Sequence, residues 1–276
     1  MAKLYSFHSL LFILSASLYY YFFFTCLVVS SEKNITTDEF SLLAFKSSIT
    51  LDPYHILSNW SISSSTCNWV GVTCDEHHGR VNALNLSSMG LEGTISPQLG
   101  NLSFLDVLDL QGNNFQGELP HELLQLKRLK LLSLSDNDFV GEIPSRIGEL
   151  SKLQGLDIGQ NNIVGVIPES ISNLSMLEYL NLISNHIKGT IPYDIGQLRQ
   201  LKFLSLSNNK LSGMIPTTIC NMSSLEEIYL ANNSLSGKIY SLYLLHVCGY
   251  FAMHCAANHK VVDQSETNSN LFLISI

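Results

Sequence analysis

The sequence predicts an α/β solenoid, in which each turn of the chain adds one short strand to a parallel sheet on a concave face. The main observation is a 24-residue pattern that repeats seven times without insertion, with starts at Val81, Leu105, Leu129, Leu153, Leu177, Leu201 and Leu225. A second is composition: 46% of the chain is hydrophobic and 14% is charged, with a net charge of −8. These values exclude a disordered polyelectrolyte and disfavour a nucleic-acid binder, which needs clustered Lys and Arg.

The first 31 residues are predicted to be a signal peptide. No residue from Leu4 to Val29 is charged, Lys3 precedes the run, and Ser30 and Ser31 follow it. These features are typical of a secretory signal that is cleaved near the two serines. The apolar run is longer than usual, which leaves an uncleaved signal anchor as the alternative. Both alternatives place the rest of the chain in the secretory pathway.

Seven Asn-x-Ser/Thr sequons fit that compartment. We expect glycans at Asn34, Asn59, Asn101, Asn173 and Asn221. The last three are separated by multiples of 24 residues, so they would occupy the same place in different coils. Asn85 and Asn232 are the other sequons, and a glycan on Asn85 would block the first coils of the concave face.

Residues 32–80 are predicted to form an N-terminal cap that begins with a helix. Thr36 and Glu39 have the spacing of a capping box, which opens a helix. We expect its core-facing side to contain Phe40, Leu43, Ala44 and Ser47. A cap is needed because the first coil would otherwise expose its leucine-rich edge.

Two cysteines in the cap are predicted to form a disulfide. Cys67 and Cys74 are seven residues apart, close to Trp60 and Trp69, in a chain predicted to enter an oxidising compartment. A metal site is disfavoured, since no second pair of ligands follows at the required spacing.

Residues 81–239 contain the repeats, of which the last is incomplete. The third unit supplies Leu129, Leu132, Leu134, Asn137, Phe139, Gly141, Ile143 and Pro144. The pattern L-x-x-L-x-L-x-x-N-x-L-x-G-x-I-P is the leucine-rich-repeat signature, and the predicted fold is a leucine-rich-repeat horseshoe. The asparagines should point inward and bond to the backbone of adjacent coils, because a buried amide without partners is costly.

The other repeated positions have structural roles as well. Each repeated glycine should allow a turn that a side chain would obstruct, and the Ile-Pro step should lead the chain to the convex side. The pattern Ile147-Gly148-x-Leu150 should close the convex face. Cys220 takes the same place as Gly148, and we expect a packed free thiol there.

The cap and the repeats resemble a known family. Trp60 followed by Cys67-x-Trp69-x-Gly71-Val72-x-Cys74 is similar to the N-terminal cap of plant leucine-rich-repeat receptor kinases. The G-x-I-P form of the repeat resembles the plant-specific class, and most closely the immune-receptor branch that includes the flagellin and elongation-factor receptors. The resemblance covers residues 37–239 and implies an extracellular recognition module. Family members also contain a transmembrane helix and a cytoplasmic kinase, which we do not find in this sequence.

Residues 240–276 depart from the repeat, and we interpret them as a divergent or truncated end. Tyr240 takes the place of the expected proline, and leucines are missing at the next repeat positions. A transmembrane helix here is disfavoured because no basic cluster follows it. A disulfide between Cys248 and Cys255, or a zinc site formed by these cysteines with His246 and His254, is a weaker alternative.

No motif predicts an enzyme, a metal site or a cofactor. The glycine-rich loop and the V-A-I-K, H-R-D and D-F-G motifs of kinases are absent from the sequence. Asp109 and Asp157 lie two coils apart, about 10 Å at the usual strand spacing, which resembles an inverting glycosidase pair. We interpret them instead as part of a solvated face.

Ligand binding is expected on the outward positions of the concave strands. Aromatic side chains gather there late in the array, beside small polar ones, and the predicted contact residues are Tyr179, Asn181, Phe203, Ser205 and Tyr229. Seven strands give a strip of roughly 29 by 13 Å, on the order of 400 Å², which is about half of one side of a standard interface. Such a strip suits an extended peptide, or a ligand shared with a co-receptor ectodomain.

Two functions from different classes follow. The first is a secreted or cell-surface module that recognises a peptide or protein in immune or developmental signalling, attached to a membrane only through an uncleaved signal or a helix further downstream. The second is a secreted inhibitor of a cell-wall-degrading enzyme, similar to polygalacturonase-inhibiting proteins. A typical inhibitor would have about ten repeats and a cysteine-stapled C-terminal cap.

Overall fold

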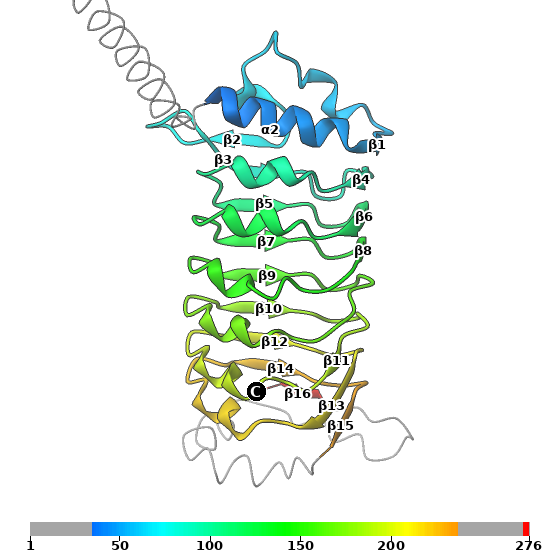
Figure 1. The fold of residues 1–276 in the computed structure, drawn as a ribbon, viewed down its shortest axis with the longest axis vertical. Helices are drawn as coiled ribbons and strands as arrows, with labels where there is room; N and C mark the ends of the chain where they lie inside the picture. Colours follow the sequence, from blue (N-terminus) through cyan, green and yellow to red (C-terminus); the bar gives the residue numbers. More distant parts are fainter. Residues whose placement is uncertain (1–34, 237–272, 276) are drawn as a thin grey trace, which may run out of the picture. The chain divides into compact units, whose positions relative to one another are not determined.

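The computed structural model describes residues 35–236 and 273–275 as a solenoid of stacked coils, so the predicted fold class is confirmed (Figure 1). The signal peptide, Asn34, the end of the seventh repeat and most of the predicted tail lie outside these residues. Within the described part of the chain, no helix has the length and apolar character needed to cross a membrane.

The predicted concave sheet contains nine strands in the order β2-β3-β5-β7-β9-β10-β12-β14-β16. Neighbouring strands from β3 to β14 pair in parallel, and β2 and β16 pair antiparallel at the two edges. Paired residues are 24 apart, as the period requires, so that Ala83 lies beside Val107 and Tyr179 beside Phe203. The bounds are β2 Val72–Cys74, β3 Val81–Asn85, β5 Val107–Asp109, β7 Leu131–Ser133, β9 Gly155–Asp157, β10 Tyr179–Asn181, β12 Phe203–Ser205, β14 Glu227–Tyr229 and β16 Leu273–Ser275.

A second set of strands, which the sequence reasoning missed, forms mostly along the segments that follow the asparagine of each repeat. One sheet has the order β1-β4-β6-β8 and another β11-β13-β15, and the bridges Glu142–Val164 and Val166–Lys188 lie between them. Within this second set, β1 pairs antiparallel with β4, and the other neighbouring strands pair in parallel. The bounds are β1 Ile49–Leu51, β4 Glu92–Thr94, β6 Asn114–Glu118, β8 Asp138–Val140, β11 Lys188–Gly189, β13 Lys210–Met214 and β15 Ser234–Ser236.

The asparagine column bonds to the backbone as predicted. Asn137 donates through Nδ2 to three carbonyl oxygens, among them Leu110 of the previous coil at 3.0 Å, and its Oδ1 accepts the Phe115 N–H at 2.9 Å. The same arrangement recurs 24 residues later at Asn161. Each amide thereby satisfies buried backbone groups of two coils and keeps their spacing constant.

Short 3₁₀ helices cover the convex side. Their bounds are η3 Pro97–Asn101, η4 His121–Gln125, η5 Ile147–Glu149, η6 Glu169–Asn173, η7 Tyr193–Gln197 and η8 Thr217–Asn221. At Gly148 a Cβ atom would lie 2.1 Å from the Ser170 carbonyl oxygen of the next coil, so close stacking requires glycine there. Cys220, predicted to be a free thiol at the equivalent place, is disulfide-bonded, and that prediction is wrong.

The cap helix α2 (Ile35–Ser47) forms where it was predicted but buries a different face. Phe40, expected in the core, is 67% exposed, and Leu43 and Ala44 are only half-buried. The buried residues are Asp38, Ser41, Leu42 and Phe45. A charged partner at the end of the cap, just before the first coil, favours this rotation of the helix because it holds the carboxylate of Asp38 inside.

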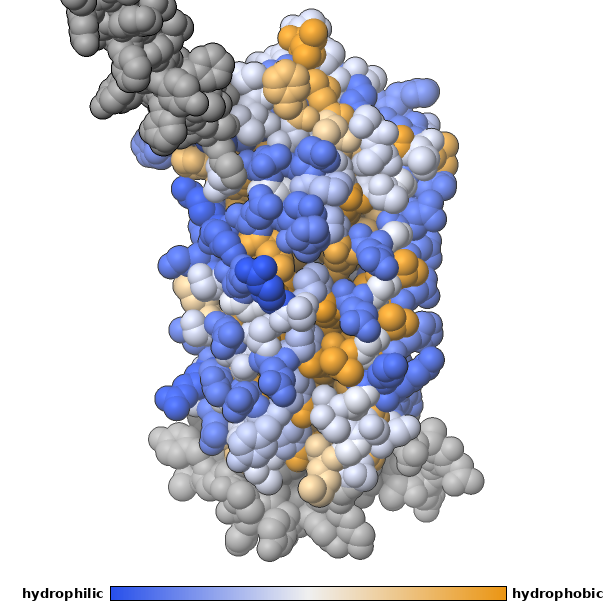
Figure 2. Space-filling model, viewed as in Figure 1, coloured by the Kyte–Doolittle hydropathy of each residue, from blue (hydrophilic) through white to orange (hydrophobic). Residues whose placement is uncertain are grey.

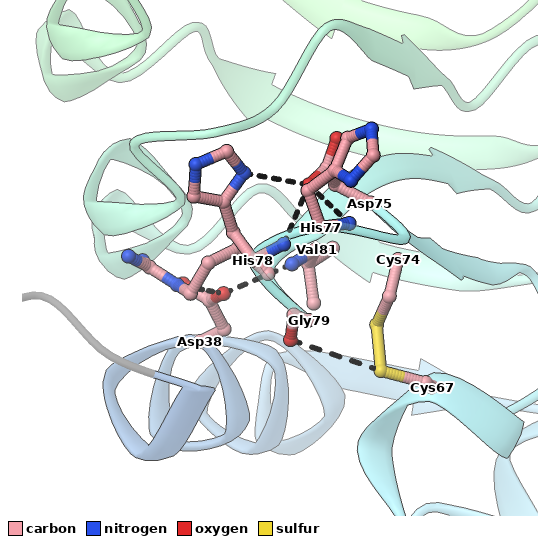
Figure 3. The surroundings of a disulfide bond; sticks show 9 residues. Asp38, Cys67, Cys74, Asp75, His77, His78, Gly79 and Val81 are labelled. Atoms are coloured by element: carbon pink, nitrogen blue, oxygen red, sulfur yellow. Dashed lines mark hydrogen bonds and ion pairs between the residues drawn. A yellow bond between two sulfur atoms is a disulfide. The ribbon is translucent and has the colours of Figure 1, made fainter.

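That partner is Arg80. Its Nε and Nη2 each donate to one carboxylate oxygen of Asp38 at 2.7 Å, and the Val81 N–H donates to the same carboxylate at 3.0 Å (Figure 3). The Asp38 side chain is fully buried and that of Arg80 is 6% exposed. A buried charge pair of this kind requires both members, since removal of one leaves the other uncompensated.

The rest of the cap is held by two tryptophans and the predicted disulfide. Trp60 and Trp69 stack with ring centroids 5.3 Å apart, and each indole N–H donates a hydrogen bond. The Cys67–Cys74 disulfide is present, with Cα atoms 5.5 Å apart (Figure 3). Short helices η1 (Ile56–Asn59) and η2 (Thr66–Asn68) connect these parts. The cap joins the repeat core through Phe45, whose ring lies 5.8 Å from that of Phe115.

Candidate functional site

The outward positions of the concave sheet form two columns, and their residues lie side by side in the order that the period predicts. Tyr179 pairs with Phe203, and Phe203 with Glu227. In the neighbouring column Asp157, Asn181, Ser205 and Tyr229 follow one another on β9, β10, β12 and β14. The five predicted contact residues therefore occupy three adjacent strands.

Three of the predicted residues form an aromatic patch, which we define as Tyr179, Phe203 and Tyr229. The rings of Tyr179 and Phe203 stack with centroids 4.5 Å apart and planes 9° apart. Tyr229 reaches diagonally across the sheet, and its ring lies 5.5 Å from that of Phe203 at 43°. All three side chains are half-buried, so each also presents surface to solvent. A rigid, partly exposed aromatic surface is typical of binding sites.

The two predicted polar residues behave differently. Asn181 is half-buried, donates to Asp157 Oδ1 at 3.0 Å and accepts the Ile183 N–H at 3.1 Å, so its amide is held in one orientation. Ser205 is only 2% exposed, and its prediction as a contact residue needs correction. Its small side chain lies in the column between the larger Asn181 and Tyr229.

Carboxylates border the patch on both sides, and the sequence reasoning did not include them in the site. Asp157 is half-buried beside β10. Burial raises the pKa of Asp157 and the charge of Asp109 adds to this effect, while hydrogen bonds to the carboxylate oppose it without cancelling it. Tyr229 donates its hydroxyl to Glu227 Oε2 at 2.7 Å, and this bond raises the pKa of Tyr229. Asp157 and Glu227 lie in the same two outward columns as the predicted contact residues, so the 24-residue period could have identified both carboxylates as part of the site.

Asp157 was predicted from the sequence to be part of a solvated face, but its side chain is half-buried. Glycines flank it at positions 155 and 159, and the Gly159 N–H donates to its Oδ1 at 3.1 Å. Burial is the first cause of its raised pKa, so this carboxylate is not freely hydrated. Asp109, in the same column two strands away, is also half-buried.

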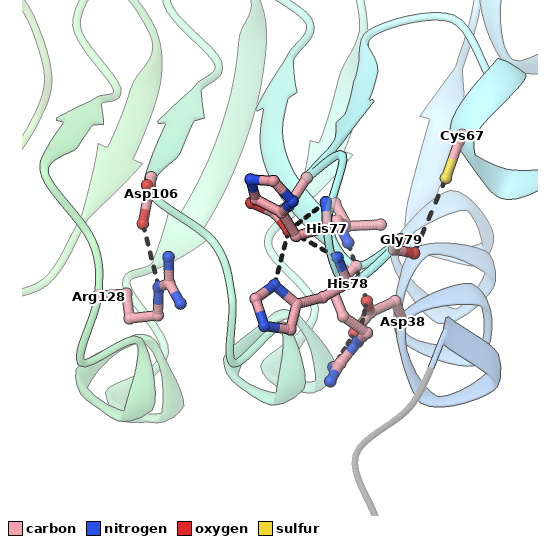
Figure 4. A network of polar contacts seen from close by, with 10 residues as sticks. Asp38, Cys67, His77, His78, Gly79, Asp106 and Arg128 are labelled. Carbon is pink, nitrogen blue, oxygen red and sulfur yellow. Dashed lines mark hydrogen bonds and ion pairs between the residues drawn. The ribbon is translucent and has the colours of Figure 1, made fainter.

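A second polar network lies at the edge of the concave sheet near the cap. Arg128 Nε lies 3.4 Å from Asp106 Oδ1, and His78 Nδ1 lies 2.7 Å from Asp75 Oδ1 (Figure 4). The guanidinium groups of Arg80 and Arg128 lie 4.7 and 4.8 Å from the centre of the Phe104 ring. These contacts join the cap to the first and second coils, and the polar groups involved find their partners within the protein.

The sequons that can be located lie mostly away from the concave strands. Asn101, Asn173 and Asn221 each end a convex 3₁₀ helix, at the same place in their coils. Asn173, Asn221 and Asn59 are exposed, whereas Asn101 is half-buried. Asn59 also donates through Nδ2 to the Asn68 carbonyl at 3.0 Å. Glycosylation itself stays a prediction, and Asn34 lies outside the described residues.

The surface seen in Figure 2 is predominantly hydrophilic, with smaller apolar areas between the polar side chains. Within residues 35–236 and 273–275, no group of three or more His, Cys, Asp or Glu side chains is arranged to hold a metal ion. The alternative zinc site at His246, Cys248, His254 and Cys255 lies outside that part of the chain.

Family models match the cap and the repeats separately. The model described as "Leucine rich repeat N-terminal domain" matches residues 35–75, and "Leucine rich repeat" models match residues 104–126, 128–150, 144–187 and 200–222. One curated relative is the LRR receptor-like serine/threonine-protein kinase EFR of Arabidopsis thaliana. It is 48% identical over 75 residues, which are 27% of this chain and 7% of the kinase. The chain thus matches only a small part of that relative's length.

Solved structures extend the similarity to most of the described chain. A crystal structure of Pollen Receptor Kinase 3 is 34% identical with a TM-score of 0.64, and the match covers 72% of this chain and 96% of that one. The ectodomain of the Arabidopsis thaliana receptor kinase GASSHO1/SCHENGEN3, solved in complex with CASPARIAN STRIP INTEGRITY FACTOR 2, is 38% identical with a TM-score of 0.69. That match covers 75% of this chain and 24% of the receptor ectodomain.

Proposed function

We propose that this chain, which belongs to the leucine-rich-repeat ectodomain family of plant receptor kinases, recognises an extended peptide or protein segment on its concave sheet. The observation that carries the proposal is the aromatic patch. Three aromatic side chains from β10, β12 and β14 pack against one another on an outward face, with an oriented amide beside them. Stacked rings with exposed edges provide contact area at low cost in side-chain entropy.

Extracellular location and a non-enzymatic role are part of this proposal. The predicted signal segment, the disulfide of the cap and the sequons all fit a secreted or cell-surface chain. The GASSHO1/SCHENGEN3 ectodomain in complex with its factor supports the view that this type of sheet binds a ligand. A strip of about 400 Å² also leaves room for a co-receptor ectodomain to complete the interface.

The inhibitor alternative is not favoured. The curated relative described above is a receptor kinase, and the two solved structures described above come from receptor kinases. Purified chain that slowed a polygalacturonase at stoichiometric concentration would restore the inhibitor alternative.

A peptide selection on the full chain tests the proposal. We expect a display library of random 12-residue peptides to yield binders that protect the amides of β9 to β14 from hydrogen exchange. Phe203→Ala should weaken these binders by about tenfold or more, as expected for a central aromatic contact. Tyr193→Ala is the matched control, because Tyr193 is an aromatic residue on the convex helix η7 that is 68% exposed. Binders that respond equally to both substitutions, or protection of the convex side alone, would refute a concave recognition site.

A further inference from the structure

We propose that the aromatic patch, with Asp157 on one side and Glu227 on the other, is a subsite for basic side chains of the ligand. The inference rests on the proposed function and specifies its ligand as a cationic, extended peptide. It assigns the two carboxylates as specificity-determining residues, in addition to the aromatic contacts.

The charge distribution of the concave strip supports a cationic ligand. The two outward columns occupy positions 83, 107, 131, 155, 179, 203 and 227, and 85, 109, 133, 157, 181, 205 and 229. They contain three carboxylates, Asp109, Asp157 and Glu227, and neither lysine nor arginine. Complementary charge in an interface favours partners of the opposite sign and disfavours partners of the same sign.

The basic residues closest to the strip are already neutralised by the protein. They belong to the position just before each strand, where Lys130 lies 2.9 Å from Asp106 and Lys202 lies 2.6 Å from Glu178. Paired lysines at the edge do not cancel the carboxylates in the middle. The two outward columns therefore have an excess of negative charge.

Both carboxylates lie close enough to the rings to act with them on one ligand. Glu227 is the register partner of Phe203, and Asp157 follows Gly155, the register partner of Tyr179. Burial, and then the charges of Asp157 and Glu227, raise the pKa of Tyr179, as expected when both carboxylates are near its ring. A guanidinium or ammonium group is attracted both to the face of an aromatic ring and to a carboxylate.

The carboxylates also have oxygen atoms that can accept hydrogen bonds from a ligand. The bonds from Gly159 and Asn181 both end on Oδ1 of Asp157, and the bond from Tyr229 ends on Oε2 of Glu227. The Ser135 side chain also interacts with the Asp157 carboxylate. A bound cation would donate to the remaining lone pairs of this carboxylate and to Glu227 Oε1. The existing bonds fix the orientation of each carboxylate before the ligand arrives, which reduces the entropic cost of binding.

The separation of the carboxylates predicts the spacing of the basic residues. Asp157 and Glu227 belong to β9 and β14, which are three strand spacings apart, or about 14 Å. An extended peptide advances about 3.3 Å per residue, so a peptide running across the strands would place basic side chains about four residues apart. The segment between them would cover the aromatic patch.

The peptides selected on the full chain provide the test. We expect them to be enriched in Arg or Lys, in pairs about four residues apart, and to bind about tenfold more weakly when both arginines are replaced by citrulline, which is neutral and nearly isosteric. On the Asp157→Asn/Glu227→Gln variant that tenfold difference should fall below about twofold. Asp109→Asn is the matched control, since it removes a charge from the same column two strands away from Asp157, and it should preserve the difference.

The possible outcomes separate this inference from the proposed function. Selected peptides that depend on Phe203 but contain no basic residues, or bind equally as citrulline peptides, would overturn the cationic subsite and leave concave recognition standing. An equal loss with Asp109→Asn would show a general effect of charge and would also overturn the assignment to Asp157 and Glu227. A selection without any Phe203-dependent binder would overturn both proposals.

Discussion

Two asparagines in the same repeat position should differ in their contribution to stability. Asn113 and Asn161 are both buried, 8% and 7% exposed, and a repeat pattern alone gives them the same role. The structure does not. Asn161 Oδ1 accepts one backbone N–H, that of Phe139, at 2.9 Å. Its Nδ2 donates to three carbonyl oxygens, and each of these also accepts a hydrogen bond from another donor. The Leu134 carbonyl accepts from Asn137, the Ile158 carbonyl from Asn185, and the Gly159 carbonyl from the Asp136 N–H. Asn161→Ala therefore leaves one buried N–H without its acceptor.

Asn113 supports more of the backbone because it serves the first coil. Its Oδ1 accepts from Met89 at 3.1 Å and from Leu91 at 3.0 Å, and its Nδ2 donates to the Leu86 carbonyl at 2.8 Å. In later coils the asparagine of the same coil also donates to the carbonyl that corresponds to Leu86, but in the first coil Met89 takes the place of that asparagine. Asn113→Ala therefore leaves two N–H groups and one carbonyl without these partners.

The size of the difference follows from the cost of unsatisfied groups. Each orphaned buried N–H costs about 1–3 kcal/mol, so we expect Asn161→Ala to lower the free energy of unfolding by about that amount. Asn113→Ala should lower the free energy of unfolding by about 1–3 kcal/mol more than Asn161→Ala does. Urea unfolding of the full chain measures both values, and hydrogen exchange at Leu91 and Phe139 reports the loss locally.

Neighbouring exposed asparagines provide the controls. Asn114→Ala and Asn162→Ala remove the same amide one residue later, where the side chain is exposed, and should change the free energy of unfolding by less than about 0.5 kcal/mol. Equal losses for Asn113→Ala and Asn161→Ala, or a larger loss for Asn161→Ala, would refute the reasoning from hydrogen-bond counts.

Three further predictions concern the carboxylate of the site and the cap. The pKa of Asp157 is raised in the fold, so the stability that it contributes is present below its unfolded value of about 3.9 and is lost as pH rises through its folded value. Asp157→Asn should therefore raise the melting temperature at pH 7, with a difference that shrinks toward pH 4; a lower melting temperature at pH 7 would contradict this. Replacing Cys67 and Cys74 by serine should cost about 2–3 kcal/mol from the entropy of the short loop, and unchanged thermal unfolding would contradict it. Asp38→Ala should cost about 3–5 kcal/mol because the buried Arg80 guanidinium loses its carboxylate partner, and the Asp38→Leu/Arg80→Met double variant should recover part of the loss in the same unfolding assay.

Much of the concave site could be predicted from the period. Because paired strand residues are 24 positions apart, the sequence already placed Tyr179 beside Phe203. It did not show that Tyr229, from the other column, reaches Phe203 diagonally, since that contact depends on side-chain direction. Nor did it show that Ser205 is covered, because the exposure of a small residue depends on its larger neighbours in adjacent coils.

The sequence by itself determined the coil: its length, its strand, its buried leucines and its asparagine column. These features recur every 24 residues because a single coil can neither bury its apolar face nor provide all hydrogen-bond partners for its buried amides. The tertiary structure alone decided which face of α2 is buried, because Arg80 lies 42 residues from Asp38 along the chain. It also decided the second set of strands and the half-buried state of Asp157, since both depend on contacts between coils that no local pattern records.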